Sequence, residues 1–88
     1  MKIKSGFLLK EIAGSFVVVP VGQDLVDFSS MVTINETGAF LWKLLENGSS
    51  ADEMCQKLLS EYEGISKEDA LNDINDFVNA LKENNILE

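Results

Sequence analysis

The spacing of apolar residues changes at Asn35, and this change constrains the fold more than any other feature of the sequence. Before it come three short apolar runs rich in β-branched or aromatic side chains: Phe7–Ile12, Phe16–Val19 and Met31–Ile34. Such side chains pack well on a pleated surface, so these runs predict strands. After Asn35, apolar residues recur every three or four positions, as on one face of a helix. The chain is therefore predicted to be a single α+β domain, with a sheet in residues 1–34 and helices in residues 35–88.

Turn residues separate the predicted strands. Ala13-Gly14-Ser15 is a short loop with a glycine, which favours a hairpin between the first two strands. Pro20 has no N–H group to donate, so the second strand should end there or lie at an edge. Short connections favour an antiparallel three-stranded meander. Three short strands cannot close a barrel, so this sheet is predicted to keep two open edges.

Capping residues mark three helices, which should cover one face of the sheet in a winged-helix-like arrangement. Asn35 can cap the first helix, Ser50 begins a capping box with Glu53, and Ser66 can cap the third helix. The third helix carries a long apolar stripe: Ala70, Leu71, Ile74, Phe77, Val78 and Leu81.

The surroundings of two residues of the first predicted helix can be predicted. Trp42 lies among leucines and is predicted to be a core residue whose indole N–H stays near the surface. Gly38 lies in the first turn, where it either permits close packing of the helix on the sheet, the interpretation we favour, or is merely tolerated.

The sequence offers little catalytic chemistry. It has no histidine and one cysteine, Cys55, whose helical spacing with leucines predicts a buried core thiol. One cysteine without any histidine disfavours a zinc site, and the sequence contains no phosphate-binding loop or dinucleotide-binding motif. Asp69, Asp73 and Asp76 share a helix face, which we interpret as a solvated acidic face. We therefore expect a protein that is not an enzyme and that binds no cofactor or metal.

Charge restricts the partners. Fifteen acidic residues and seven lysines give a net charge of −8, and arginine is absent. Residues 1–34 carry three acids and three lysines, so the helical part, with twelve acids and four lysines, holds the net charge. This field disfavours nucleic acids and anionic membranes. A lone cysteine, and an N-terminus that leads into no long apolar run, predict a cytoplasmic protein.

Three stretches of the sequence resemble the PqqD-like family and together cover nearly the whole chain. They are Phe7–Gly14 with Val18–Gly22, the segment Thr33–Leu45 (TINETGAFLWKLL), and the closing pattern Ala70-x-x-Asp73-Ile74-x-x-Phe77-x-x-x-Leu81. The segment Ile34–Leu45 is the most specific. Lys10 departs from the arginine that many relatives carry there, so no bidentate contact is expected from that position.

The resemblance implies a RiPP recognition element, which binds the leader of a ribosomally made precursor peptide. It implies an adaptor that presents this peptide to a modifying enzyme, either a radical SAM maturase or a leader peptidase. The leader would add as a strand beside the third strand, in a cleft against the third helix. The site residues expected on this basis are Met31, Val32, Thr33, Ile34, Leu71, Ile74 and Val78.

Two other functions stay open from the sequence. The small sheet with three helices is also typical of a winged-helix DNA-binding regulator, although the charge argues against it. The same open edge would also suit a self-associating protein, such as a homodimer.

Overall fold

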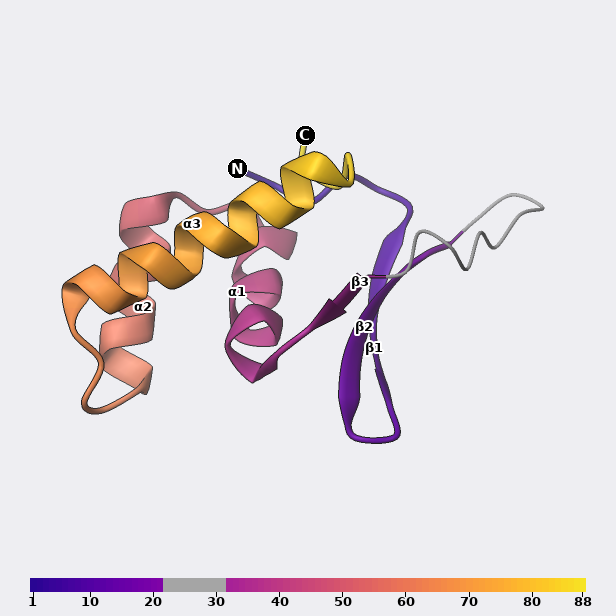
Figure 1. Cartoon of the computed structure of the whole chain (residues 1–88). Coiled ribbons are helices and arrows are strands. Elements are labelled where there is room, and N and C mark those ends of the chain that lie inside the picture. Colours follow the sequence, from indigo (N-terminus) through magenta and orange to yellow (C-terminus); the bar gives the residue numbers. More distant parts are fainter. Residues whose placement is uncertain (22–31) are drawn as a thin grey trace.

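The computed structural model describes residues 1–21 and 32–88, and its elements follow the predicted order (Figure 1). The strands are β1 (Phe7–Ile12), β2 (Ser15–Pro20) and β3 (Val32–Ile34), and the helices are α1 (Glu36–Glu46), α2 (Ala51–Glu61) and α3 (Lys67–Glu83). A three-stranded antiparallel sheet followed by three helices confirms the predicted α+β fold. Met31, which was expected to begin the third strand, lies outside the described residues.

The sheet has the order β1-β2-β3, so β3 lies at one edge. The β1–β2 hairpin turns at Ala13 and Gly14, which both have positive φ angles, of 51° and 81°. Two left-handed residues in a tight turn match the twist of the strands on either side. Pro20 ends β2, as its missing N–H predicts.

All three predicted helix caps are formed. In each, the side-chain oxygen of the cap accepts a hydrogen bond from the backbone N–H three residues ahead, at 2.7 to 3.1 Å: Asn35 from Gly38, Ser50 from Glu53, and Ser66 from Asp69. Each cap satisfies a donor that the helix itself cannot pair, and each stabilises its helix by about 1 kcal/mol. Local sequence therefore sets where every helix begins.

The core lies between the helices and one face of the sheet. Its fully buried side chains include Leu41, Leu45, Leu58, Ile74 and Leu81. Cys55 is only 4% exposed, which confirms the predicted core thiol.

Trp42 is also in the core, but the expectation for its indole was wrong. The residue is 1% exposed, and its Nε1 atom is buried with no hydrogen-bond partner among the described residues. The ring is enclosed within the core cluster, so the N–H does not reach the surface. A buried donor without a partner costs about 1–3 kcal/mol, which the burial of so large a ring offsets.

The two ends of the chain pair with each other. Ile3 and Leu87 form an antiparallel bridge, and the Lys4 N–H donates to the Ile86 carbonyl at 2.8 Å. The Ile3 N–H also donates to the Leu45 carbonyl of α1 at 3.2 Å. Figure 1 shows both termini beside the last turns of α3. The N- and C-terminal segments therefore leave the outer edge of β3 clear.

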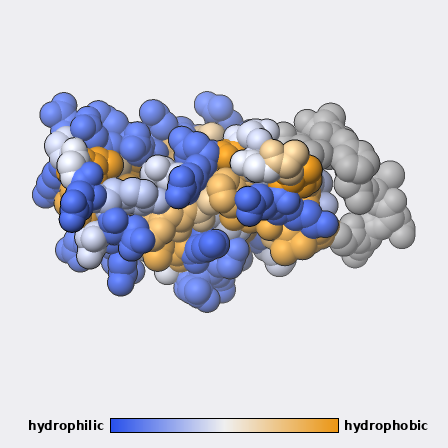
Figure 2. All heavy atoms as spheres, turned by 90° about the horizontal axis from the view of Figure 1, so that it is seen from below, coloured by the Kyte–Doolittle hydropathy of each residue, from blue (hydrophilic) through white to orange (hydrophobic). Residues whose placement is uncertain are grey.

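Hydrophilic and apolar side chains are unevenly distributed over the surface, as they are along the sequence. Figure 2 shows hydrophilic side chains dense over the α2–α3 end and more apolar surface over the middle of the molecule and the sheet. None of the described helices combines the length and apolar character needed to cross a membrane. Within residues 1–21 and 32–88, no cluster of three acidic or sulfur-bearing side chains is placed to hold a metal ion.

Candidate functional site

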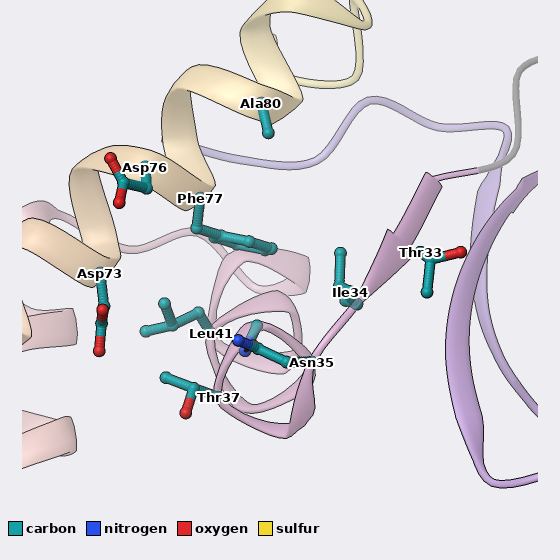
Figure 3. Close-up of a pocket in the computed structure, with 10 residues that line it drawn as sticks. Thr33, Ile34, Asn35, Thr37, Leu41, Asp73, Asp76, Phe77 and Ala80 are labelled. Atoms are coloured by element: carbon teal, nitrogen blue, oxygen red, sulfur yellow. Dashed lines mark hydrogen bonds between the residues drawn. The ribbon is translucent and has the colours of Figure 1, made fainter.

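A groove lies between β3 and α3, above the first turn of α1 (Figure 3). Its volume is about 270 Å³. The residues that line it are Thr33, Ile34, Asn35, Thr37, Gly38, Leu41, Asp73, Asp76, Phe77 and Ala80. Three elements thus line it: an edge strand and the middle of one helix form the walls, and the start of another helix forms the floor.

The β3 wall presents backbone groups, and the register identifies which ones. The Val21 N–H donates to the Gly6 carbonyl at 2.7 Å, and Gly6 faces Val21 in the continued β1–β2 register. Hydrogen-bonded pairs alternate along an antiparallel ladder, so Val17 must also direct its N–H and C=O toward β1. Its partner in β3 is Thr33. Thr33 therefore directs its own N–H and C=O away from β2, toward the open edge.

The side chains of β3 divide between the two faces of the sheet. Ile34 is half-buried and packs against the core, whereas Thr33 is exposed. Figure 3 shows Ile34 pointing toward Phe77 and Thr33 pointing to the other side of the strand. The contribution of Thr33 to the groove is consequently its backbone, and that of Ile34 is an apolar side chain.

The floor of the groove is the first turn of α1, where Gly38 allows a close approach. A Cβ built on Gly38 would stand 3.1 Å from the Ile34 Cβ and 3.4 Å from the Phe77 Cδ1. The expected close packing of Gly38 is thereby confirmed. Asn35 holds the turn, since its Oδ1 accepts the Gly38 N–H at 2.7 Å.

The α3 wall combines apolar and acidic side chains. Asp73, Asp76, Phe77 and Ala80 follow one another at intervals of three, one and three residues, so they share one face of the helix. Phe77 is 8% exposed and projects toward Ile34 in Figure 3. Within the described part of the chain, the charged side chains that line the groove are both acidic.

The structure brings some of the expected site residues to the groove and leaves others elsewhere. Thr33 and Ile34 line it, and Val32 lies on the same strand with its side chain against the core. Met31 lies outside the described residues.

The three helix residues expected at the site lie away from the groove. Ile74 is 0% and Val78 7% exposed, and both belong to the core. Leu71 lines a separate hollow between α2 and α3, with Leu59 and Cys55. At about 100° per residue, Leu71 stands about 120° around α3 from Phe77, so it cannot share the wall. That hollow is larger, at about 510 Å³, but no edge strand borders it.

The residues of the α3 wall stand out in the sequence but were not predicted to belong to the site. Phe77 was part of the apolar stripe, and Asp73 and Asp76 were part of the acidic face. The feature that could have identified this wall is the position of the acidic residues next to the apolar stripe, because such a border lies between the core and the solvent. Ala80 carried no signal of its own.

Comparison with known proteins identifies the family of this chain. Residues 16–87 match the family of coenzyme PQQ synthesis protein D (PqqD). The chain belongs to the PqqD family. A structure of TbiB1 in complex with the TbiA(beta) leader peptide has a TM-score of 0.77 and 24% sequence identity, over 100% of this chain and 95% of that chain. A lasso peptide synthetase B1 complexed with the leader peptide has a TM-score of 0.71 and 28% identity, over 97% of this chain and 93% of the other. No curated protein sequence matched the chain.

Among the residues that the structure describes, the titratable group with a shifted pKa is Tyr62, which lies outside the groove. Tyr62 follows α2 and meets Phe40 edge-on, with ring centroids 5.8 Å apart. Burial raises the pKa of the Tyr62 hydroxyl, and the charges of Glu36 and Glu61 raise it further. The phenol therefore stays protonated near neutral pH.

Proposed function

We propose that this PqqD-family protein is an adaptor that binds the leader of a ribosomally made precursor peptide as an added strand beside β3. The observation that carries the proposal is the outward backbone of Thr33, an unpaired donor and acceptor among the described residues, at the rim of the groove. An open edge next to an apolar groove is the arrangement that strand addition requires. Two proteins of similar fold, one of them 28% identical, are known as complexes with leader peptides.

The backbone and the groove would have different roles in binding. Hydrogen bonds to an edge strand set the register of the guest and add on the order of 1 kcal/mol each. A leader that is disordered when free must also offset its ordering entropy. Most of the affinity would therefore come from apolar guest side chains between Ile34 and Phe77, above the floor formed by Gly38. This revises the expected helix residues, since the α3 contacts become Asp73, Asp76, Phe77 and Ala80.

Delivery to a modifying enzyme completes the proposed function. Holding the leader raises the local concentration of the core peptide at the partner, either a radical SAM maturase or a leader peptidase. We infer a reducing cytoplasm as the compartment, because the one cysteine of the sequence is free and buried.

We also propose that the adaptor makes and breaks no bonds itself. The only candidate nucleophile, Cys55, is 4% exposed among core side chains and lies outside the groove. A Cys55→Ala variant should support the full rate of leader processing in an assay with the partner enzyme. A loss of processing with unchanged leader affinity would contradict the proposal.

A titration of isotope-labelled protein with the candidate leader tests the site. The precursor peptide encoded beside a radical SAM or peptidase gene supplies that leader, and a scrambled peptide of the same composition is the control. The amides of Thr33 and of residues 73–80 should shift most, because the former faces the guest and the latter form the opposite wall. Shifts confined to β1 would overturn the assignment.

The DNA-binding alternative has no comparable support. The charged side chains found at the groove are acidic, and the chain carries −8 overall without arginine. A mobility-shift assay with random duplex at low salt should show no complex. Sedimentation without peptide tests the remaining alternative, since a concentration-dependent dimer would indicate that β3 pairs with a second copy.

A further inference from the structure

The groove has an acidic end and an apolar end, and their separation matches the repeat of a strand. On α3, Asp73 precedes Phe77 by four residues, and Asp76 precedes Ala80 by four residues. Asp73 therefore stands about 6 Å along the helix axis from Phe77, whereas Asp76 stands only about 1.5 Å along that axis from Phe77. In a strand, side chains on the same face repeat every about 6.6 Å. A guest strand along β3 would present two successive inward side chains to the two ends.

The two ends require different chemistry of the guest. At the apolar end, Phe77, Ile34 and the small Ala80 leave room for a large apolar side chain. At the acidic end, Asp73 projects from α3 toward Thr37, whereas Asp76 projects from α3 away from Thr37 (Figure 3). No lysine lines the described groove, so its own residues do not neutralise the two carboxylates at this wall. A guest cation would be complementary to them.

The geometry points to a specific class of leader, an inference that rests on the proposed function. We infer that this groove selects an extended peptide in which a lysine or arginine stands two residues from a large apolar residue. The apolar side chain fills the space beside Phe77, and the cation faces Asp73, while Asp76 adds to the negative charge of this wall. The carboxylates thus set the register and favour basic leaders, while the backbone of Thr33 holds any leader.

A display experiment tests this inference with the intact chain. An mRNA-displayed library of random nonapeptides is selected on immobilised wild-type protein, with a Thr33→Pro variant as the background. Retained peptides should carry Lys or Arg two positions from a large apolar residue at about three times the input frequency or more, as an exposed ion pair allows. A synthetic peptide from the selected set should lose affinity by a similar factor when its cation is replaced by glutamine.

Two variants separate the groove carboxylates from the charge of the whole protein. Asp73→Asn with Asp76→Asn should remove the preference for cations and keep the preference for the apolar residue. Glu68→Gln with Glu83→Gln removes the same two charges from exposed positions of α3 outside the groove, and should keep both preferences. Circular dichroism establishes that all variants are folded before selection.

The possible outcomes distinguish this inference from the proposed function. Peptides enriched in apolar residues without a cation would overturn the inference and leave the adaptor function standing. A preference for cations that survives the Asp73 and Asp76 replacements would also overturn it, because the source would lie elsewhere. No enrichment above the Thr33→Pro background would overturn both.

Discussion

Gly38 lies so close to Ile34 that a Cβ atom on the glycine would stand 3.1 Å from the isoleucine Cβ. The last residue of β3 and the first turn of α1 are therefore in direct backbone-to-side-chain contact. The Cδ1 atom of Phe77, in α3, would lie 3.4 Å from the same added Cβ atom. One missing side chain thus brings the sheet, the first helix and the third helix together at the floor of the groove.

Replacing Gly38 with alanine should destabilise the protein despite the better helix propensity of alanine. Propensity would add about 1 kcal/mol of stability, but the crowding against Ile34 and Phe77 should remove about 1–3 kcal/mol. We expect a net loss of about 1 kcal/mol in the free energy of urea-induced unfolding, together with weaker leader binding. A variant more stable than wild type would show that the contact has no energetic effect.

Replacing Thr33 with proline should abolish leader binding and leave the fold intact. The Thr33 N–H points away from β2, so its removal breaks none of the β2–β3 hydrogen bonds. Thr33→Val is the matched control, because it keeps both the N–H and a β-branched side chain. Calorimetric titration should detect binding only for the valine variant. Unchanged affinity of the proline variant would count against strand addition at this edge.

Filling the groove from the α3 side should block the leader without disturbing the core. Ala80 is half-buried at the groove wall, and a leucine there would occupy the space intended for a guest side chain. We expect at least a tenfold loss of affinity for Ala80→Leu, about 1.4 kcal/mol, with unchanged helical content. Asn79→Leu places the same side chain on the neighbouring exposed position and should leave the affinity unchanged. Equal effects of the two variants would locate the binding site elsewhere.

The pKa of the Tyr62 hydroxyl should be higher in the folded protein than in the unfolded chain. Because burial, Glu36 and Glu61 raise its pKa, tyrosinate should form above the ordinary value of about 10 in the folded protein. The stability that this shift supplies is present below about pH 10 and is lost as the pH rises through the folded pKa. Tyr62 is the one tyrosine, so tyrosinate absorbance reports it directly. A native midpoint at or below that of the urea-unfolded chain would contradict this prediction, and Glu36→Gln should lower the native midpoint.

Much of the fold could be read from local sequence. The caps at Asn35, Ser50 and Ser66 each satisfy a nearby N–H, so three residues determine where the helices begin. The end of β2 at Pro20 follows from a missing donor. These features depend on residues a few positions apart, and no long-range contact is needed to predict them.

The site depended on contacts that local sequence does not contain. The apolar stripe of α3 indicated a buried face, but it did not show which margin turns toward β3, so Leu71 was expected in place of Ala80. The buried indole N–H of Trp42 was missed for the same reason. The spacing of apolar residues shows which residues share a face of the helix, whereas packing decides how that face is turned relative to a distant strand. For this protein the sequence alone determined the elements and their order, and only the tertiary structure decided which residues form the groove, because side chains far apart in the chain meet there.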